Sequence, residues 1–202
     1  SFAASIFAFE LDDSVVTNSV KKSTAPFYKY VDSAVTLTPS ATSGNSVTLT
    51  SSTSIFSSAW VGLYLQIGSI PKQVKITAYS NATTVTCQVI ETLANTDAES
   101  DWSEELISAT RGYPQAVSFH DNRLWFGGVR DKPSSIIASH IAGYFNFSLG
   151  TGLADESINV AIAGDRVNEI RHLISSRNLQ IFTDGAEYFV PTSANSAAIT
   201  PS

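Results

Sequence analysis

Residues 113–128 read YPQAVSFHDNRLWFGG, and this stretch decides the fold class of the chain. Its two short apolar runs, at 116–119 and 124–126, are rich in aromatic and β-branched residues, which favour strands. Asp121 and Asn122 lie between the runs, and both residue types tolerate the left-handed backbone of a tight turn. The stretch therefore predicts a β-hairpin.

More strands are expected downstream, on both sides of a loop-like segment at 146–156. The expected strands lie at 134–139, 170–174, 178–183 and 186–190. Asp184 and Gly185 separate the last two, and an Asp-Gly pair favours a type I′ turn, because both central residues of that turn need positive φ. Together these signals predict an antiparallel β protein.

Apolar positions recur at a fixed spacing in this region. Three of them, Phe119, Leu124 and Phe126, have counterparts 55 residues later, which are Ile174, Leu179 and Ile181. A fixed offset of this kind indicates a repeated, blade-like unit. We therefore expect residues 111–202 to form propeller-like antiparallel hairpins.

Composition limits the class of protein. The chain has 202 residues, of which 43% are hydrophobic and 15% charged, and this balance is typical of globular proteins. A net charge of −6 disfavours tight binding to nucleic acid. Cys87 is the single cysteine, which excludes a disulfide within the chain and favours synthesis in a cytoplasm. The lack of methionine indicates either a removed initiator or a segment of a longer polypeptide.

Two regions precede the hairpins of 111–202. Residues 1–33 are expected to form an extended arm, whose apolar run at 2–9 is too short to span a bilayer and is interpreted as a strand. Residues 34–93 alternate Ser or Thr with apolar residues, which predicts a small β-sandwich or barrel. Its expected strands lie at 35–38, 46–50, 60–67, 73–78 and 83–90.

Residues 94–110 are expected to form an acidic linker or a short helix around Trp102. The acidic residues are Asp97, Glu99, Asp101, Glu104 and Glu105. Paired carboxylates are what glycoside hydrolysis needs, so the first four are candidate catalytic residues of a polysaccharide-degrading enzyme. Clustered acids in a connector are more often simply solvated, and we favour that interpretation.

No catalytic, cofactor or metal site is assigned from the sequence. The histidines, at positions 120, 140 and 172, do not have metal-ligand spacing, and no GxSxG motif marks a serine nucleophile. Aromatic faces can pack on sugar rings, which makes Trp60, Tyr64 and Tyr79 candidates for glycan binding. Because Trp60 begins an apolar run, core packing is the favoured interpretation of that residue.

Two stretches resemble a known family. The segment GYPQAVSFHDNRLWFGG and the segment that runs from GYFNFSLGTG to QIFTDGAEYFV are similar to the tail nozzle proteins of short-tailed phages. These are also called tail tubular protein B or DNA-stabilisation proteins. The resemblance extends in weaker form over residues 34–190.

The resemblance implies a structural virion protein of the phage tail, without catalytic residues or cofactors. Subunits of the family form a ring, typically a hexamer, below a tail adaptor, and each carries a β-propeller. The ring encloses the channel through which the genomic DNA is ejected, without tight binding. Family members are longer than this chain, so either part of the propeller is missing or this member has a reduced form. A host-glycan adhesin and a polysaccharide-degrading enzyme are the alternatives.

Overall fold

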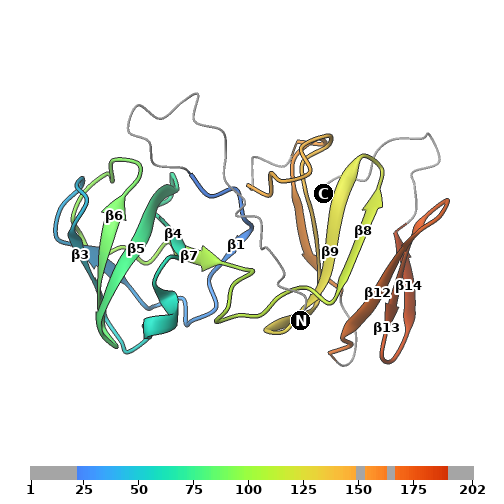
Figure 1. Ribbon diagram of the computed structural model, residues 1–202, viewed down its shortest axis with the longest axis horizontal. Helices are drawn as coiled ribbons and strands as arrows, with labels where there is room; N and C mark the ends of the chain where they lie inside the picture. The colour runs from blue at the N-terminus through green and yellow to red at the C-terminus, as the bar shows by residue number, and fades with distance from the viewer. Residues whose placement is uncertain (1–21, 149–152, 163–166, 191–202) are drawn as a thin grey trace, which may run out of the picture. The chain divides into compact units, whose positions relative to one another are not determined.

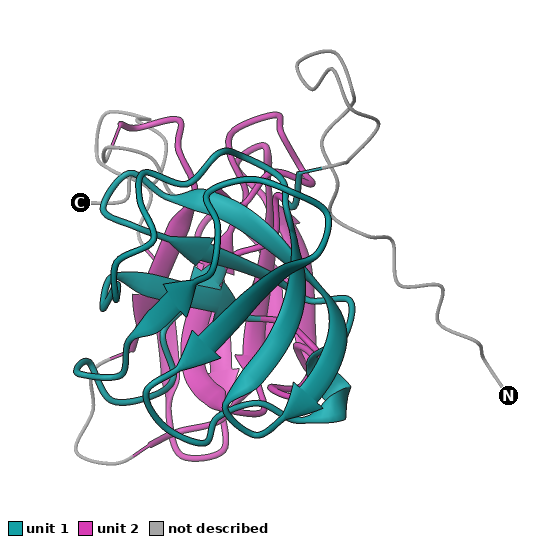
Figure 2. Cartoon of the chain, turned by 90° about the vertical axis from the view of Figure 1, so that its left-hand side faces the viewer, with its two compact units in different colours: residues 1–23, 27–106 teal, residues 24–26, 107–202 magenta. Residues whose placement is uncertain are grey.

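The computed structural model describes residues 22–148, 153–162 and 167–190. The chain divides into two compact units: unit 1 comprises residues 1–23 and 27–106, and unit 2 comprises residues 24–26 and 107–202 (Figures 1 and 2). Apart from one turn of 3-10 helix at Ser58–Trp60, the regular elements in the described ranges are β-strands. The all-β prediction is confirmed. The run at 2–9 lies outside the described residues.

Unit 1 is built on one antiparallel sheet of seven strands, in the order β1-β7-β4-β5-β6-β3-β2. The strands are β1 (Phe27–Tyr28), β2 (Leu37–Pro39), β3 (Val47–Ser51), β4 (Tyr64–Ile67), β5 (Lys72–Asn81), β6 (Thr84–Val89) and β7 (Trp102–Glu105). Over the described residues this sheet is open, with β1 and β2 at its edges, so it is not a closed barrel.

The alternating Ser/Thr pattern produces this sheet because successive side chains of a strand point to opposite faces. In β3, Val47 and Leu49 are buried, whereas the intervening threonines are exposed. The buried apolar side chains form one core, which includes Leu37, Leu49, Phe56, Trp60, Leu65, Val74, Ile76, Val85, Cys87 and Trp102. The two expected hairpins of this region are present, as β2 with β3 and β5 with β6.

Within residues 94–110, expected to form an acidic linker or a short helix, residues 102–105 form a strand instead. Strand β7 lies between β1 and β4 inside the sheet, and Trp102 in it is buried with its Nε1 donating to the Val35 carbonyl at 2.8 Å. Glu105 accepts hydrogen bonds from Ser23 Oγ at 2.7 Å and from the Tyr64 amide at 3.3 Å. These partners are distant in sequence. Composition alone could not reveal them, so the acidic residues were interpreted as solvated. The units divide after residue 106.

Unit 2 holds two antiparallel sheets in which sequential strands pair. The first has the order β11-β10-β9-β8, and the second has the order β12-β13-β14 (Figure 1). The strands are β8 (Ala116–His120), β9 (Arg123–Val129), β10 (Lys132–Ala138), β11 (Ile158–Ala161), β12 (Ile170–Ser175), β13 (Leu179–Thr183) and β14 (Glu187–Val190).

The two predicted turns differ in outcome. Asp121 and Asn122 have φ of 47° and 55°, as a two-residue turn with left-handed backbone requires. The hairpin around Asp184 and Gly185 exists, but neither residue has positive φ, so the type I′ prediction was wrong there. Thr183 explains the difference, because its Oγ1 accepts a hydrogen bond from the Ala186 amide at 2.9 Å.

The 55-residue offset matches the strands. Adding 55 to the residue numbers of β9 gives 178–184, a range that contains β13. Adding 55 to the first residue number of β10 gives 187, and Glu187 is the first residue of β14. One proposed equivalence shifts by a residue: Phe119 pairs with Leu124, but Ser175, and not Ile174, pairs with Leu179. The loop between β12 and β13 has three residues and the loop between β8 and β9 has two, which accounts for the shift.

The two sheets of unit 2 pack through a shared core. Its buried members are Ala116, Trp125, Ile136, Ala138 and Ile158 from the first sheet and Ile170, Leu173, Leu179 and Ile181 from the second. Close approach depends on two glycines of β9. A Cβ at Gly127 would lie 2.8 Å from Ile170 Cγ2, and one at Gly128 would lie 2.3 Å from the Ile170 carbonyl oxygen. Only residues without a Cβ allow β12 to lie this close.

Substituting Gly128 tests this contact. Gly128→Ala adds an overpacking cost to the cost of its left-handed backbone (φ +70°), so we expect a loss of about 3 kcal/mol or more in unfolding free energy. Gly62→Ala is the matched control, because Gly62 also has positive φ (+97°) and open space around the added Cβ. It should lose about 1–2 kcal/mol. Urea unfolding measures both, and equal losses would contradict the packing argument.

Cys87 gives a pH prediction. Burial in the core of unit 1 raises the pKa of the Cys87 thiol from 9.0 to about 12. Below pH 9 both folded and unfolded states keep the proton, so stability is unaffected. Above pH 9 only the unfolded state loses it, and stability should fall by about 2 kcal/mol at pH 10.5 relative to Cys87→Val. Urea unfolding of both proteins between pH 8 and 10.5 measures the difference, and parallel curves would exclude it.

Candidate functional site

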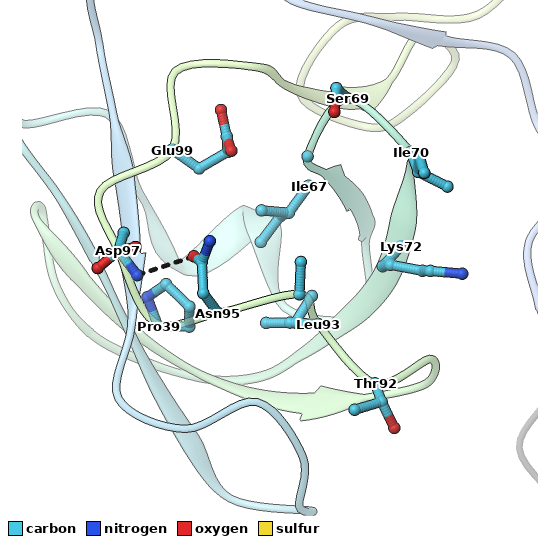
Figure 3. Close-up of a pocket in the computed structure, with 12 residues that line it drawn as sticks. Pro39, Ile67, Ser69, Ile70, Lys72, Thr92, Leu93, Asn95, Asp97 and Glu99 are labelled. Atoms are coloured by element: carbon cyan, nitrogen blue, oxygen red, sulfur yellow. Dashed lines mark hydrogen bonds between the residues drawn. The ribbon is translucent and has the colours of Figure 1, made fainter.

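A recess opens on unit 1 between the β4–β5 turn and the segment that follows β6 (Figure 3). Its volume is about 340 Å³. Twelve residues line it: Pro39, Ile67, Gly68, Ser69, Ile70, Lys72, Thr92, Leu93, Ala94, Asn95, Asp97 and Glu99. The recess brings together residues from the acidic segment, among them Asp97 and Glu99.

Backbone contacts hold the acidic side of the recess. Glu99 forms a bridge with Leu37, with an amide-to-carbonyl distance of 2.8 Å in one direction and 2.9 Å in the other. The Asp97 amide donates to Asn95 Oδ1 at 3.0 Å, as Figure 3 shows. The buried side chains of Ile67 and Leu93 supply an apolar surface within the recess. The arrangement suits a ligand with an apolar body and hydroxyl or cationic groups.

The four acids considered for catalysis do not meet in this recess. Asp97 and Glu99 line it, but Asp101 and Glu104 do not. Glu104 is fully buried in β7. Glu99 Oε1 is engaged by the Asp101 amide at 2.8 Å, so one oxygen of that carboxylate serves its own loop. Of the four acids, Asp97 and Glu99 are therefore the two that the recess brings together.

The three aromatic candidates also separate. Trp60 is buried and packs edge-on against Phe56, with ring centroids 5.3 Å apart. Tyr64 is buried in β4 beneath Lys75, whose Nζ lies 4.8 Å from the ring centroid. Only Tyr79 is exposed, and the residues that line the recess include no aromatic side chain. Core packing of Trp60, the favoured interpretation, is confirmed.

The three histidines belong to unit 2. His120 Nδ1 lies 3.0 Å from Ser175 Oγ, and its Nε2 lies 3.7 Å from Asp121 Oδ2. This set has the residue types of a catalytic triad, but the imidazole is almost completely buried and its Nε2 has no hydrogen-bond partner. A general base must exchange protons with a substrate, so we assign His120 to the joint between β8 and β12. In the described ranges, no cluster of three metal-ligating side chains occurs.

Arg123 is a feature that sequence reasoning missed. Its guanidinium is fully buried and donates to the carbonyls of Ser139 at 2.5 Å, Glu156 at 2.5 Å and Ala154 at 2.6 Å. Burial lowers the pKa of Arg123, and the nearby carboxylates of Asp155 and Asp121 oppose that shift. The residue fixes the segment before β11. The sequence gave no sign of this role, because the hydrogen-bond acceptors of Arg123 are backbone carbonyls, which every residue type has.

A second unpredicted feature is an exposed apolar surface on β8. Val117 and Phe119 point outward from this edge strand, and the ring of Tyr144 packs edge-on against Phe119 with centroids 5.3 Å apart. An alternating strand with a wet face normally presents polar residues there. This surface is therefore a candidate for contact with another sheet.

No protein-family model matches the chain, and no curated protein matches it with significant similarity. Within the described part of the chain, no helix is long and apolar enough to cross a membrane.

Trp60 and Tyr79 form a matched pair for testing the aromatic candidates. Trp60→Ala removes a buried ring, so we expect a loss of about 3–5 kcal/mol in unfolding free energy. Tyr79→Ala alters an exposed side chain and should change it by less than about 0.5 kcal/mol. Urea unfolding measures both. A stable Trp60→Ala variant would contradict the assigned core position.

Proposed function

We propose that this chain is a structural subunit of a phage virion, and more specifically of the tail nozzle ring of a short-tailed phage. Support comes first from the resemblance of residues 112–128 and 143–190 to that family. The observation that carries the proposal is the repeat in unit 2, where antiparallel sheets at a 55-residue offset pack face to face through a glycine contact. Sheets stacked in this way are the building principle of β-propellers.

The chemistry of the described residues favours a role in architecture. Polar side chains that are fully or partly buried, such as Glu105, His120 and Arg123, hold strands and loops in place. The recess of unit 1 presents carboxylates without an aromatic platform. An adhesin that stacks sugars on Trp60 or Tyr64 is disfavoured, because both rings are buried.

Charge is compatible with a channel for DNA. The chain has a net charge of −6, so a ring of such subunits would repel phosphate groups and let the genome slide. Each Lys or Arg that neutralised a phosphate would instead add affinity and slow release. In this proposal the ring helps retain the genome in the capsid and releases it without binding it tightly.

The mass of the native assembly tests the proposed function. We expect a closed ring, typically of six copies, because unlike faces that repeat around an axis close on themselves. Multi-angle light scattering gives the mass and negative-stain microscopy gives the shape. In the phage that encodes the chain, deleting its gene should yield particles that fail to retain DNA. A trimer would indicate a fibre or spike, and particles that retain DNA without the protein would refute the nozzle role.

A further inference from the structure

The recess of unit 1 combines an apolar surface with two carboxylates. Ile67 and Leu93 are each 5% exposed and belong to the core of that unit, so the hydrocarbon surface of the recess is continuous with the core. Asp97 and Glu99 line the same space, and Asp97 is exposed while Glu99 is partly exposed (Figure 3). A ligand that fills the recess therefore needs a hydrocarbon part and a polar part.

Backbone hydrogen bonds hold the walls of the recess in place. The Gly68 amide donates to the Asp101 carbonyl at 2.7 Å, which ties the β4–β5 turn to the acidic segment. The Leu93 amide donates to the Thr42 carbonyl at 2.9 Å, and a bridge to β2 holds the acidic side. A site formed in advance needs little ordering to bind. Its volume of about 340 Å³ lies within the range of small-molecule sites.

The carboxylates of the recess have no ion-pair partner among the residues that the structure describes. Close contacts between acidic and basic side chains in these ranges involve other acids, which are Glu91, Asp121, Asp131 and Glu169. Lys72 lines the recess, but Figure 3 shows its side chain directed away from Asp97 and Glu99. The lining itself therefore does not compensate the negative charge.

Lys29 is a positive charge near the recess, but its donors are engaged elsewhere. Its ammonium interacts electrostatically with Glu99. Its N–H groups donate to three backbone carbonyls, which are those of Ser33 at 2.8 Å, Val35 at 2.9 Å and Ser100 at 2.6 Å. A lysine ammonium has three N–H donors, so none is left for the carboxylate of Glu99.

We propose that the recess binds an aliphatic amine. Its ammonium group lies at the carboxylates of Asp97 and Glu99, and its hydrocarbon chain lies on Ile67 and Leu93. The Asp101 amide engages Oε1 of Glu99, which leaves Oε2 as an acceptor for the ligand. Charge complementarity and burial of the chain both favour the complex. The inference does not depend on the nozzle role.

Other ligand classes fit the recess less well. A neutral hydroxyl would leave the charge of both carboxylates uncompensated, and its hydrogen bonds are weaker than those of an ammonium. A sugar would find no aromatic side chain to stack on in the lining. A metal ion needs more ligands than these two carboxylates, and the described ranges contain no cluster of three metal-ligating side chains.

Titration calorimetry of the full chain with n-pentylamine tests the site. Asp97→Asn and Glu99→Gln remove one charge each with little change of shape, and each should raise the dissociation constant about fivefold or more. Gln at position 99 keeps a carbonyl that can accept from the Asp101 amide. Circular dichroism confirms folding. If Glu99→Gln does not fold, Asp97→Asn carries the test, because it alters an exposed side chain.

Glu187→Gln is the matched control. It removes the same charge from an exposed residue of β14 that does not line the recess, so the variant should bind n-pentylamine as the wild type does. A loss equal to that of Asp97→Asn would show attraction to the net charge of the chain and would overturn the proposal. Wild-type affinity in both recess variants, or no saturable binding to the wild type, would overturn it as well.

Two further ligands separate the contributions of charge and chain. Ethylamine lacks three methylenes and 1-pentanol lacks the charge, so each should bind about tenfold more weakly than n-pentylamine, or worse. Equal affinity of either one would contradict the assigned contacts. Nα-acetyl-lysine N-methylamide identifies the source of the amine. If it binds at least as tightly as n-pentylamine, the occupant is a lysine side chain of a partner, and weaker binding assigns the site to a free amine.

Discussion

The close approach of β12 to β9 is the contact on which the form of unit 2 depends. The Ile170 carbonyl and side chain occupy the space that a Cβ would take at Gly128 and Gly127. This contact brings the second sheet onto the first, buries Trp125 and places His120 within hydrogen-bond distance of Ser175. A side chain at either glycine would separate the sheets and expose the shared core. The strand registers then decide which side chains of the first sheet, Val117 and Phe119 among them, point away from the shared core.

Unit 1 is held together by a different arrangement, in which a polar segment completes the sheet. Strand β7 joins β1 to β4, so the order of the sheet depends on four residues of acidic composition. Their polar groups have partners: Glu105 is bonded to Ser23 and to the Tyr64 amide, and Trp102 to the Val35 carbonyl. Taking these groups fully or partly out of water is tolerated because hydrogen bonds replace those lost to water.

These features favour a protein that acts through shape. Buried Arg123 and His120 are joined to backbone carbonyls and to a neighbouring strand, and Val117, Phe119 and Phe189 expose apolar side chains on the strands of unit 2. The recess around Asp97 and Glu99 is a candidate ligand site of modest size, lined by polar as well as apolar residues. A tail component assembled from repeated β-sheets fits this distribution, with the recess available for contacts of its own.

The sequence by itself determined the strands and most of the core, because alternation and turn chemistry are local properties. The alternation in β3, the turn at Asp121 and Asn122 and the burial of Trp60 are examples. Tertiary structure alone decided the place of β7, the role of Arg123 and the one-residue shift at Ser175. These depend on partners many residues away, and periodicity does not reveal them. For the same reason the sequence did not indicate the recess of unit 1 or the exposed side chains of Val117 and Phe119. A local apolar pattern does not show which face of a strand another sheet will cover.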